Sequence, residues 1–109
     1  MKIDRLNILA IGRNPEIMTV MNRLLNAPEH WYGVTVATDE EAYAAFEKEQ
    51  FRILLLCAGV TPEEETVLKD KLSSSHPDLI IRRHYGGGSG LLKNEIQFLL
   101  DQQNIQLPS

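Results

Sequence analysis

Cysteine is almost absent from this chain of 109 residues, in which Cys57 stands alone. A single thiol excludes an internal disulfide and argues against a zinc site built from several cysteines. Basic blocks are also missing: the net charge is -4, and Arg82-Arg83 is only a pair. We therefore expect neither a metal centre of this kind nor a non-specific nucleic-acid surface.

Long hydrophobic runs are lacking as well. No segment approaches the length of a membrane span, and the first residues show neither the apolar stretch nor the small-residue cleavage site of a signal peptide. The apolar share of 43% and the charged share of 24% are those of an ordinary globular domain. We expect one cytoplasmic domain over residues 1–104 followed by a tail over 105–109, with no cofactor and no membrane or nucleic-acid partner.

Glycine is unevenly distributed. Four of the seven glycines fall within the run 84–90, whose sequence is His-Tyr-Gly-Gly-Gly-Ser-Gly. The run lies between an apolar, strand-like segment ending in Arg82-Arg83 and a periodic helix beginning near Leu91. Glycines at such a junction let backbone amides face an anion at a helix N-terminus. The spacing matches neither a dinucleotide-binding fingerprint nor a P-loop.

Short apolar strands alternate with amphipathic helices along the chain. Strands are predicted over residues 7–12, 31–37, 51–57 and 79–84, and each is followed by a helix. Asn14-Pro15 starts the first helix, while Thr38 and Thr61 each open a capping box. This alternation predicts an α/β fold, a three-layer sandwich in which helices cover both faces of a four-stranded parallel sheet. In such sheets ligands bind beyond the carboxyl ends of the strands.

Three segments carry a resemblance to a known family. They are 7–16 (NILAIGRNPE) leading to Leu24-Leu25, the helix start 38–42 (TDEEA), and the buried strand 51–57 (FRILLLC). Over most of its length the chain resembles a bacterial response-regulator receiver domain. The resemblance implies a flavodoxin-like sheet with strand order 2-1-3-4.

The chemistry of receivers is missing from the matching positions. Receivers end their first strand with paired acids that hold Mg²⁺, and Gly12 and Arg13 stand there. The phospho-accepting aspartate of the third strand is replaced by Cys57, and a thiol beside an arginine is a poor magnesium site. Only four strand–helix units are present. Either the fifth unit is lost, or the fourth is lost and His84-Tyr85 replaces the usual lysine-proline pair.

Three functions remain open on these residues. The first is a non-phosphorylatable, receiver-like signalling module that is no enzyme, acts through protein–protein contacts and forms a homodimer through its last strand and helix. The second is a domain that binds a phosphate, nucleotide or other small anion at the carboxyl edge; its candidate residues are Arg13, Asn14, Cys57, His84, Tyr85, Gly86, Gly87, Gly88 and Ser89. The third is a cysteine-dependent enzyme that uses Cys57 as nucleophile and His84 as base.

The arginine pair also has two interpretations. Consecutive strand residues point to opposite faces, so Arg82 and Arg83 are unusual in a strand covered on both sides. We interpret them first as charges that protect an edge strand from pairing with another chain. The alternative is that they bind acidic groups of a partner.

Overall fold

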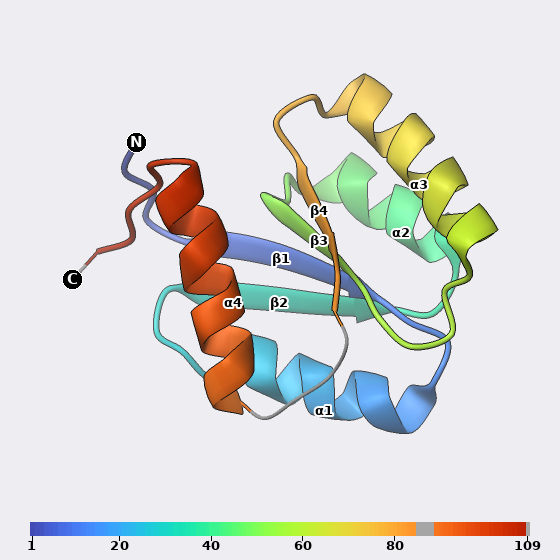
Figure 1. Cartoon of the computed structure of the whole chain (residues 1–109), viewed down its shortest axis with the longest axis horizontal. Coiled ribbons are helices and arrows are strands. Elements are labelled where there is room, and N and C mark those ends of the chain that lie inside the picture. Colours follow the sequence, from blue (N-terminus) through green and yellow to red (C-terminus); the bar gives the residue numbers. More distant parts are fainter. Residues whose placement is uncertain (85–88, 109) are drawn as a thin grey trace.

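The computed structural model describes residues 1–84 and 89–108, and it alternates strands with helices throughout (Figure 1). The elements are β1 (Leu6–Ile11), α1 (Pro15–Leu25), β2 (Trp31–Val36), α2 (Asp39–Lys48), β3 (Ile53–Leu56), α3 (Pro62–Ser75), β4 (Ile80–Arg83) and α4 (Ser89–Gln102). The predicted units are therefore present. The third and fourth strands are shorter than expected because their outer residues, among them Phe51 and Cys57, lie beyond the paired segments.

The four strands form one parallel sheet in the order β2-β1-β3-β4. In the register, Ile8 lies beside Gly33 on one side and beside Ile53 on the other, and Leu56 lies beside Arg83. The chain thus has the predicted flavodoxin-like α/β fold with strand order 2-1-3-4. β3, whose sequence is an unbroken Ile-Leu-Leu-Leu run, lies between β1 and β4, and all four of its residues are buried.

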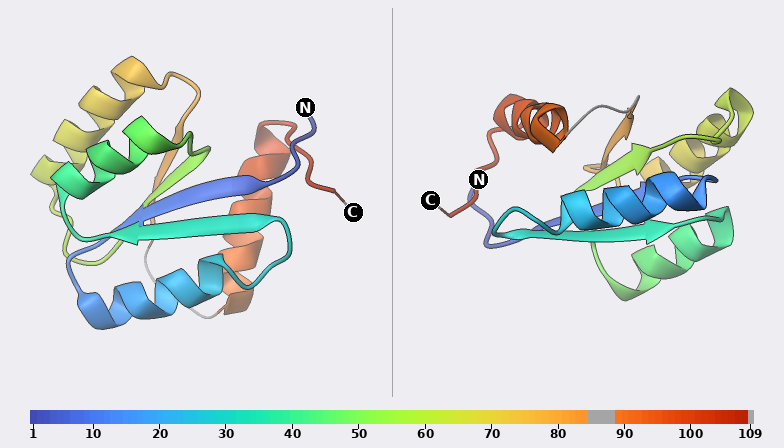
Figure 2. Two further views of the ribbon diagram at one scale, coloured as in Figure 1. Left: turned by 180° about the vertical axis from the view of Figure 1, so that it is seen from behind. Right: turned by 90° about the horizontal axis from the view of Figure 1, so that it is seen from below.

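Helices cover both faces of the sheet (Figures 1 and 2). α1 and α4 pack on one face, where their core residues include Met21, Leu25 and Ile96. α2 and α3 pack on the other, through residues such as Phe46 and Leu68. The two faces are distinct because successive strand residues alternate between them.

The starts of the first three helices follow the predicted capping chemistry. The Asn14 side chain accepts a hydrogen bond from the Ile17 amide. Thr38 and Thr61 each form a capping box with the glutamate three residues later. These interactions satisfy amides that a helix leaves without an internal partner.

The position of α4 shows where the sheet stops. A right-handed crossover that continued outward past β4 would place its helix on the face of α2 and α3. α4 instead packs on the face of α1. The sheet therefore has no strand beyond β4 in the part of the chain that the structure describes, and β4 is an edge strand.

The segment after α4 returns to the first residues. Ile105 is buried, a bridge joins Lys2 to Gln106, and the Ile3 amide donates to the Gln106 carbonyl over 2.9 Å. Part of the predicted tail thus contributes to the core. Over the described ranges, none of the helices combines the length and apolar character that crossing a membrane requires.

Some large apolar residues of the helices are exposed. Ile17 and Val20 on α1 and Val67 on α3 keep more than two fifths of their surface in solvent, and Leu91 on α4 keeps 64%. The spacing of α1 predicts one apolar face over Ile17, Val20, Met21, Leu24 and Leu25. Of this set α1 buries Met21 and Leu25, together with Met18, so the buried face is turned slightly from the predicted one.

Candidate functional site

The carboxyl edge of the sheet is formed by loops that main-chain hydrogen bonds hold together. The Gly12 amide donates to the Val36 carbonyl over 3.1 Å, and the Arg13 amide donates to the Ala58 carbonyl over 2.8 Å. These bonds connect the ends of β1, β2 and β3. The loops that were expected to converge here do so, apart from residues 85–88, which lie outside the described part of the chain.

Arg13 occupies the centre of this edge. Its Nη2 atom lies 2.8 Å from Asp39 Oδ1 and 3.2 Å from Glu64 Oε2, and Nη1 donates to the Ala37 carbonyl over 2.7 Å. We call this group, Arg13 with Asp39 and Glu64, the Arg13 cluster. The hydrogen bond with Asp39 raises the pKa of Arg13, although partial burial opposes the rise. The cluster therefore holds a permanent cation between the starts of α2 and α3.

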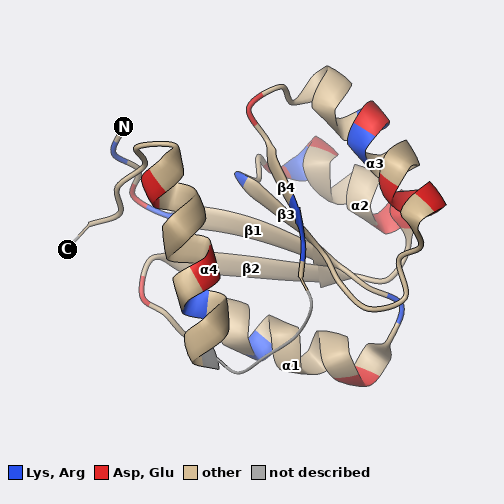
Figure 3. Ribbon diagram, in the orientation of Figure 1, with Lys and Arg blue, Asp and Glu red and all other residues tan. Residues whose placement is uncertain are grey.

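Both carboxylates of the Arg13 cluster belong to helix N-termini. Asp39 is the first residue of α2, and Glu64 closes the capping box of α3 by accepting from the Thr61 amide over 2.9 Å. The bond from the Thr61 backbone lowers the pKa of Glu64, and Arg13 lowers it further. Figure 3 shows how acidic residues collect on these two helices. Arg13 thus joins three loops through one side chain.

Two glycines allow the edge to close around these side chains. A Cβ atom on Gly12 would lie 2.5 Å from Met18 Sδ and 3.0 Å from Cys57 Cβ, so neighbouring side chains already fill that space. Gly59 has a φ of 93°, and a Cβ there would lie 2.6 Å from Arg13 Cβ. An acidic side chain at Gly12 would therefore require the Met18 side chain to move.

The anion-binding prediction for Arg13 and Asn14 is not supported by these contacts. The guanidinium is already neutralised by two carboxylates, which together outweigh its charge. The Asn14 side chain accepts from the Ile17 amide over 3.0 Å and so serves as the helix cap. An anion entering here would meet the carboxylates of the Arg13 cluster rather than a free cation.

Cys57 and His84 lie next to each other at the ends of β3 and β4. The His84 amide donates to the Leu56 carbonyl over 2.8 Å, which continues the strand pairing by one residue. By the alternation of the strands both side chains face α4. Both are also buried, with exposed fractions of 1% for Cys57 and 8% for His84. The structure thus brings the predicted pair to one place.

Glu95 supplies a third group that the sequence did not reveal. Both of its carboxylate oxygens lie 3.4 Å from His84 Nδ1. Burial raises the pKa of Cys57 to about 12, the charge of Glu95 adds to the rise, and Arg83 opposes it. At neutral pH the thiol is protonated, whereas a nucleophilic cysteine needs a lowered pKa. The arrangement orients His84 but does not activate Cys57.

The remaining predicted site residues belong to the glycine run. Tyr85, Gly86, Gly87 and Gly88 lie outside the described residues. Ser89 is the first residue of α4, and a Cβ on Gly90 would meet nothing within 4 Å. The anion-binding hypothesis for the glycine run therefore stays a prediction.

The two consecutive arginines have different environments. Arg83 faces α3, where Nη2 lies 2.7 Å from Glu65 Oε1 and also donates to the Val60 carbonyl over 2.9 Å. Lys69 and Arg83 together lower the pKa of Glu65. Arg82 is exposed on the opposite face. The sequence did not reveal this ion pair, because Arg83 and Glu65 lie 18 residues apart.

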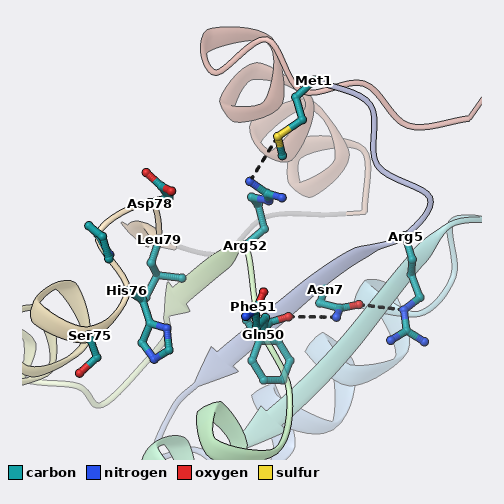
Figure 4. Close-up of a pocket in the computed structure, with 11 residues that line it drawn as sticks. Met1, Arg5, Asn7, Gln50, Phe51, Arg52, Ser75, His76, Asp78 and Leu79 are labelled. Atoms are coloured by element: carbon teal, nitrogen blue, oxygen red, sulfur yellow. Dashed lines mark hydrogen bonds between the residues drawn. The ribbon is translucent and has the colours of Figure 1, made fainter.

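A hollow of about 610 Å³ lies at the opposite, amino edge of the sheet (Figure 4). Arg5 donates through Nε to Asn7 Oδ1 over 2.9 Å, and Asn7 Nδ2 donates to the Gln50 carbonyl over 3.0 Å. Arg52 points away from them toward Met1 Sδ, at 4.0 Å (Figure 4). His76 is partly buried, with its ring centroid 4.8 Å from that of Phe46. The polar groups of this hollow do not converge on one point.

No metal site emerges from the side chains that the structure describes, since nowhere do three His, Cys, Asp or Glu residues gather in a suitable arrangement. The candidate site is therefore the carboxyl edge of the sheet. The Arg13 cluster lies on the side of α2 and α3, and the buried pair of Cys57 and His84 lies on the side of α4. In comparisons with known proteins, no family model, no curated protein and no solved structure matches this chain.

Proposed function

We propose that this chain is a receiver-like regulatory module that cannot be phosphorylated and acts through protein–protein contacts. The observation that carries the proposal is the Arg13 cluster. A covalently attached guanidinium lies between Asp39 and Glu64, at the edge where parallel α/β sheets bind ligands.

Two further observations support the same function. Met18 and Cys57 fill the space next to Gly12 where a magnesium-binding acid would need to lie. Cys57 itself has a protonated thiol at neutral pH because burial raises its pKa to about 12. Neither Gly12 nor Cys57 provides a hard oxygen ligand for Mg²⁺ or a carboxylate that could accept a phosphoryl group.

The exposure of β4 and α4 supports a function through protein contacts. β4 is an edge strand, and Leu91 and Phe98 on α4 are 64% and 59% exposed. The two side chains are seven residues apart and so lie on one helical face. The homodimer expected through the last strand and helix stays a prediction, which sedimentation velocity at high micromolar concentration tests.

A phosphorylation assay and a ligand screen test the proposed function. The protein is incubated with acetyl phosphate and Mg²⁺ and its intact mass is followed, and melting temperatures are recorded with nucleotides and phosphorylated metabolites. We expect no phosphoryl adduct and no rise in melting temperature beyond that in potassium chloride of equal ionic strength.

A stable adduct would overturn the proposal. So would a saturable rise in melting temperature, which would favour the anion-binding function of the glycine run instead. The variant Arg13→Gln is the matched control. If a ligand raises the melting temperature of this variant as much as that of the wild type, its binding does not depend on the Arg13 cluster.

A further inference from the structure

The two edge strands of the sheet, β2 and β4, differ in how their outward-facing backbone groups are hydrogen-bonded. At the β2 edge, the Gly33 amide donates to Asn26 Oδ1 over 2.9 Å, and Asn26 Nδ2 donates to the Gly33 carbonyl over 3.0 Å. The Trp31 amide is bonded to the Pro28 carbonyl. These contacts occupy three of the six outward-facing backbone groups of Trp31, Gly33 and Thr35, so the β2 edge is partly blocked to another strand.

The β4 edge has no such protection in the described part of the chain. The amides of Ile80 and His84 donate inward, to the carbonyls of Arg52 and Leu56. Because backbone groups alternate along a strand, the N–H and C=O groups of Ile81 and Arg83 point outward. They are spaced as one side of a β-ladder.

A groove runs along this open edge. Its volume is about 490 Å³, and it is lined by Ile80, Ile81 and Arg82 on β4 and by Gln103 and Ile105 beyond α4, among other residues. It is continuous with the amino-edge hollow, with which it shares Arg52 and Asp78. The residues that line the groove include none from α4, which packs over the α1 side of the sheet. The groove therefore lies beside the amino part of β4, next to the open edge.

The charges in the groove indicate what fits it. Arg82 is exposed and Arg52 is partly exposed, and neither forms an ion pair with any residue whose placement is known. Asp78 is the single carboxylate among the lining residues. A second copy paired antiparallel through β4 would bring two unpaired Arg82 side chains onto the same short ribbon, where like charges are unfavourable. An acidic segment would meet opposite charge instead, so on the β4 edge we favour it over the second copy expected through the last strand and helix.

We propose that the β4 edge binds an extended, acidic segment of a partner protein by strand addition. The backbone groups of Ile81 and Arg83 form the ladder, acidic side chains lie on the face of Arg82, and apolar ones lie on the face of Ile81. This inference rests on the proposed function and names the partner chemistry for it.

Model peptides test the inference. An acetylated, fluorescently labelled peptide of alternating valine and glutamate is titrated with the full chain, and anisotropy is recorded beside the matching valine–lysine peptide. We expect saturable binding of the glutamate peptide only. Two further versions carry N-methyl groups on the odd or the even residues. Strand addition uses one edge of the peptide, so one version should bind and the other should not.

Charge reversal on the protein provides the second arm. Arg82→Glu should weaken binding of the glutamate peptide about threefold or more and allow the lysine peptide to bind, because the side chain is exposed and unpaired. Arg23→Glu is the control, since it changes net charge equally on α1, away from the groove. Circular dichroism establishes that both variants fold.

Several outcomes would overturn the inference. They are binding of neither peptide, binding that both N-methylated versions retain, and equal effects of the two charge reversals. A dimer that must dissociate before the peptide binds would identify a second copy as the occupant. None of these results bears on phosphorylation or ligand binding, so the proposed function stands or falls separately.

Discussion

Replacing Asn26 by alanine should destabilise the protein by opening the β2 edge. The side chain makes two hydrogen bonds with the backbone of Gly33 and a third with the Asn22 carbonyl, over 2.8 to 3.0 Å. A hydrogen bond contributes a net of about 0.5–1.5 kcal/mol, and the pair with Gly33 is partly shielded from water. We therefore expect Asn26→Ala to lower the free energy of unfolding by about 2 kcal/mol, which corresponds to about 8–12 °C in melting temperature.

Urea unfolding followed by far-ultraviolet circular dichroism measures the global effect, and hydrogen exchange of the Gly33 amide measures the local one. Asn22→Ala is the control, because among the described residues the Asn22 side chain makes only an exposed contact with Thr35 at 3.4 Å, and its backbone carbonyl is unchanged by the substitution. It should change stability by less than about 0.5 kcal/mol. The reasoning fails if Asn26→Ala is as stable as the control and the exchange of the Gly33 amide is unchanged.

Three other perturbations test the described contacts. With its pKa raised to about 12, Cys57 should react with iodoacetamide at pH 8 at least about tenfold more slowly in the folded protein than in denaturant, as followed by intact mass; equal rates would contradict its burial. The pKa of Glu64 is lowered in the folded state, so its contribution to stability is present above its unfolded pKa of about 4.3 and is lost as pH falls through the folded value. The stability difference between wild type and Arg13→Ala, from urea titrations, should therefore narrow below about pH 4, and a difference independent of pH would count against the Arg13 cluster. Gly33→Ala would place its Cβ atom 2.3 Å from the Cβ atom of Leu25, so this variant should lower the free energy of unfolding by about 1–3 kcal/mol. Gly90→Ala has open space around the new methyl group, so its melting temperature should be unchanged or higher.

Local interactions made much of the fold predictable. The caps at Asn14, Thr38 and Thr61 connect residues three apart, so a helix start can be recognised from a few neighbouring residues in the sequence. The alternation of strands and helices likewise predicts a parallel sheet, and the resemblance to receivers supplied its order. These features depend on short windows of sequence.

Contacts between distant residues were not predictable in the same way. Arg13 meets Asp39 across 26 residues, and nothing in either local sequence indicates the pairing. His84 and Glu95 meet only because α4 packs on the face of α1. The sequence placed the candidate residues at the correct edge, but it did not reveal which charges were already satisfied by one another.

The phase of α1 is a further example. An apolar stripe through Ile17 and Val20 and one through Met18 and Leu25 are both compatible with helical spacing. The close approach of Gly33 to Leu25 decides between them, and that approach depends on how β2 pairs with β1.

The Arg13 cluster has a consequence for how such a module could carry information. A site for a diffusible cation is filled to an extent that follows the concentration of the ion, so its loops can report a change in the surroundings. A tethered guanidinium is present in every folded molecule, and its occupancy is fixed when the chain folds. On the proposed function, occupancy of this position by a cation then carries no signal. In a module of this kind, the signal would depend on how many molecules are present and on which partners they bind. Removing divalent ions with a chelator should leave the loops of the carboxyl edge unchanged.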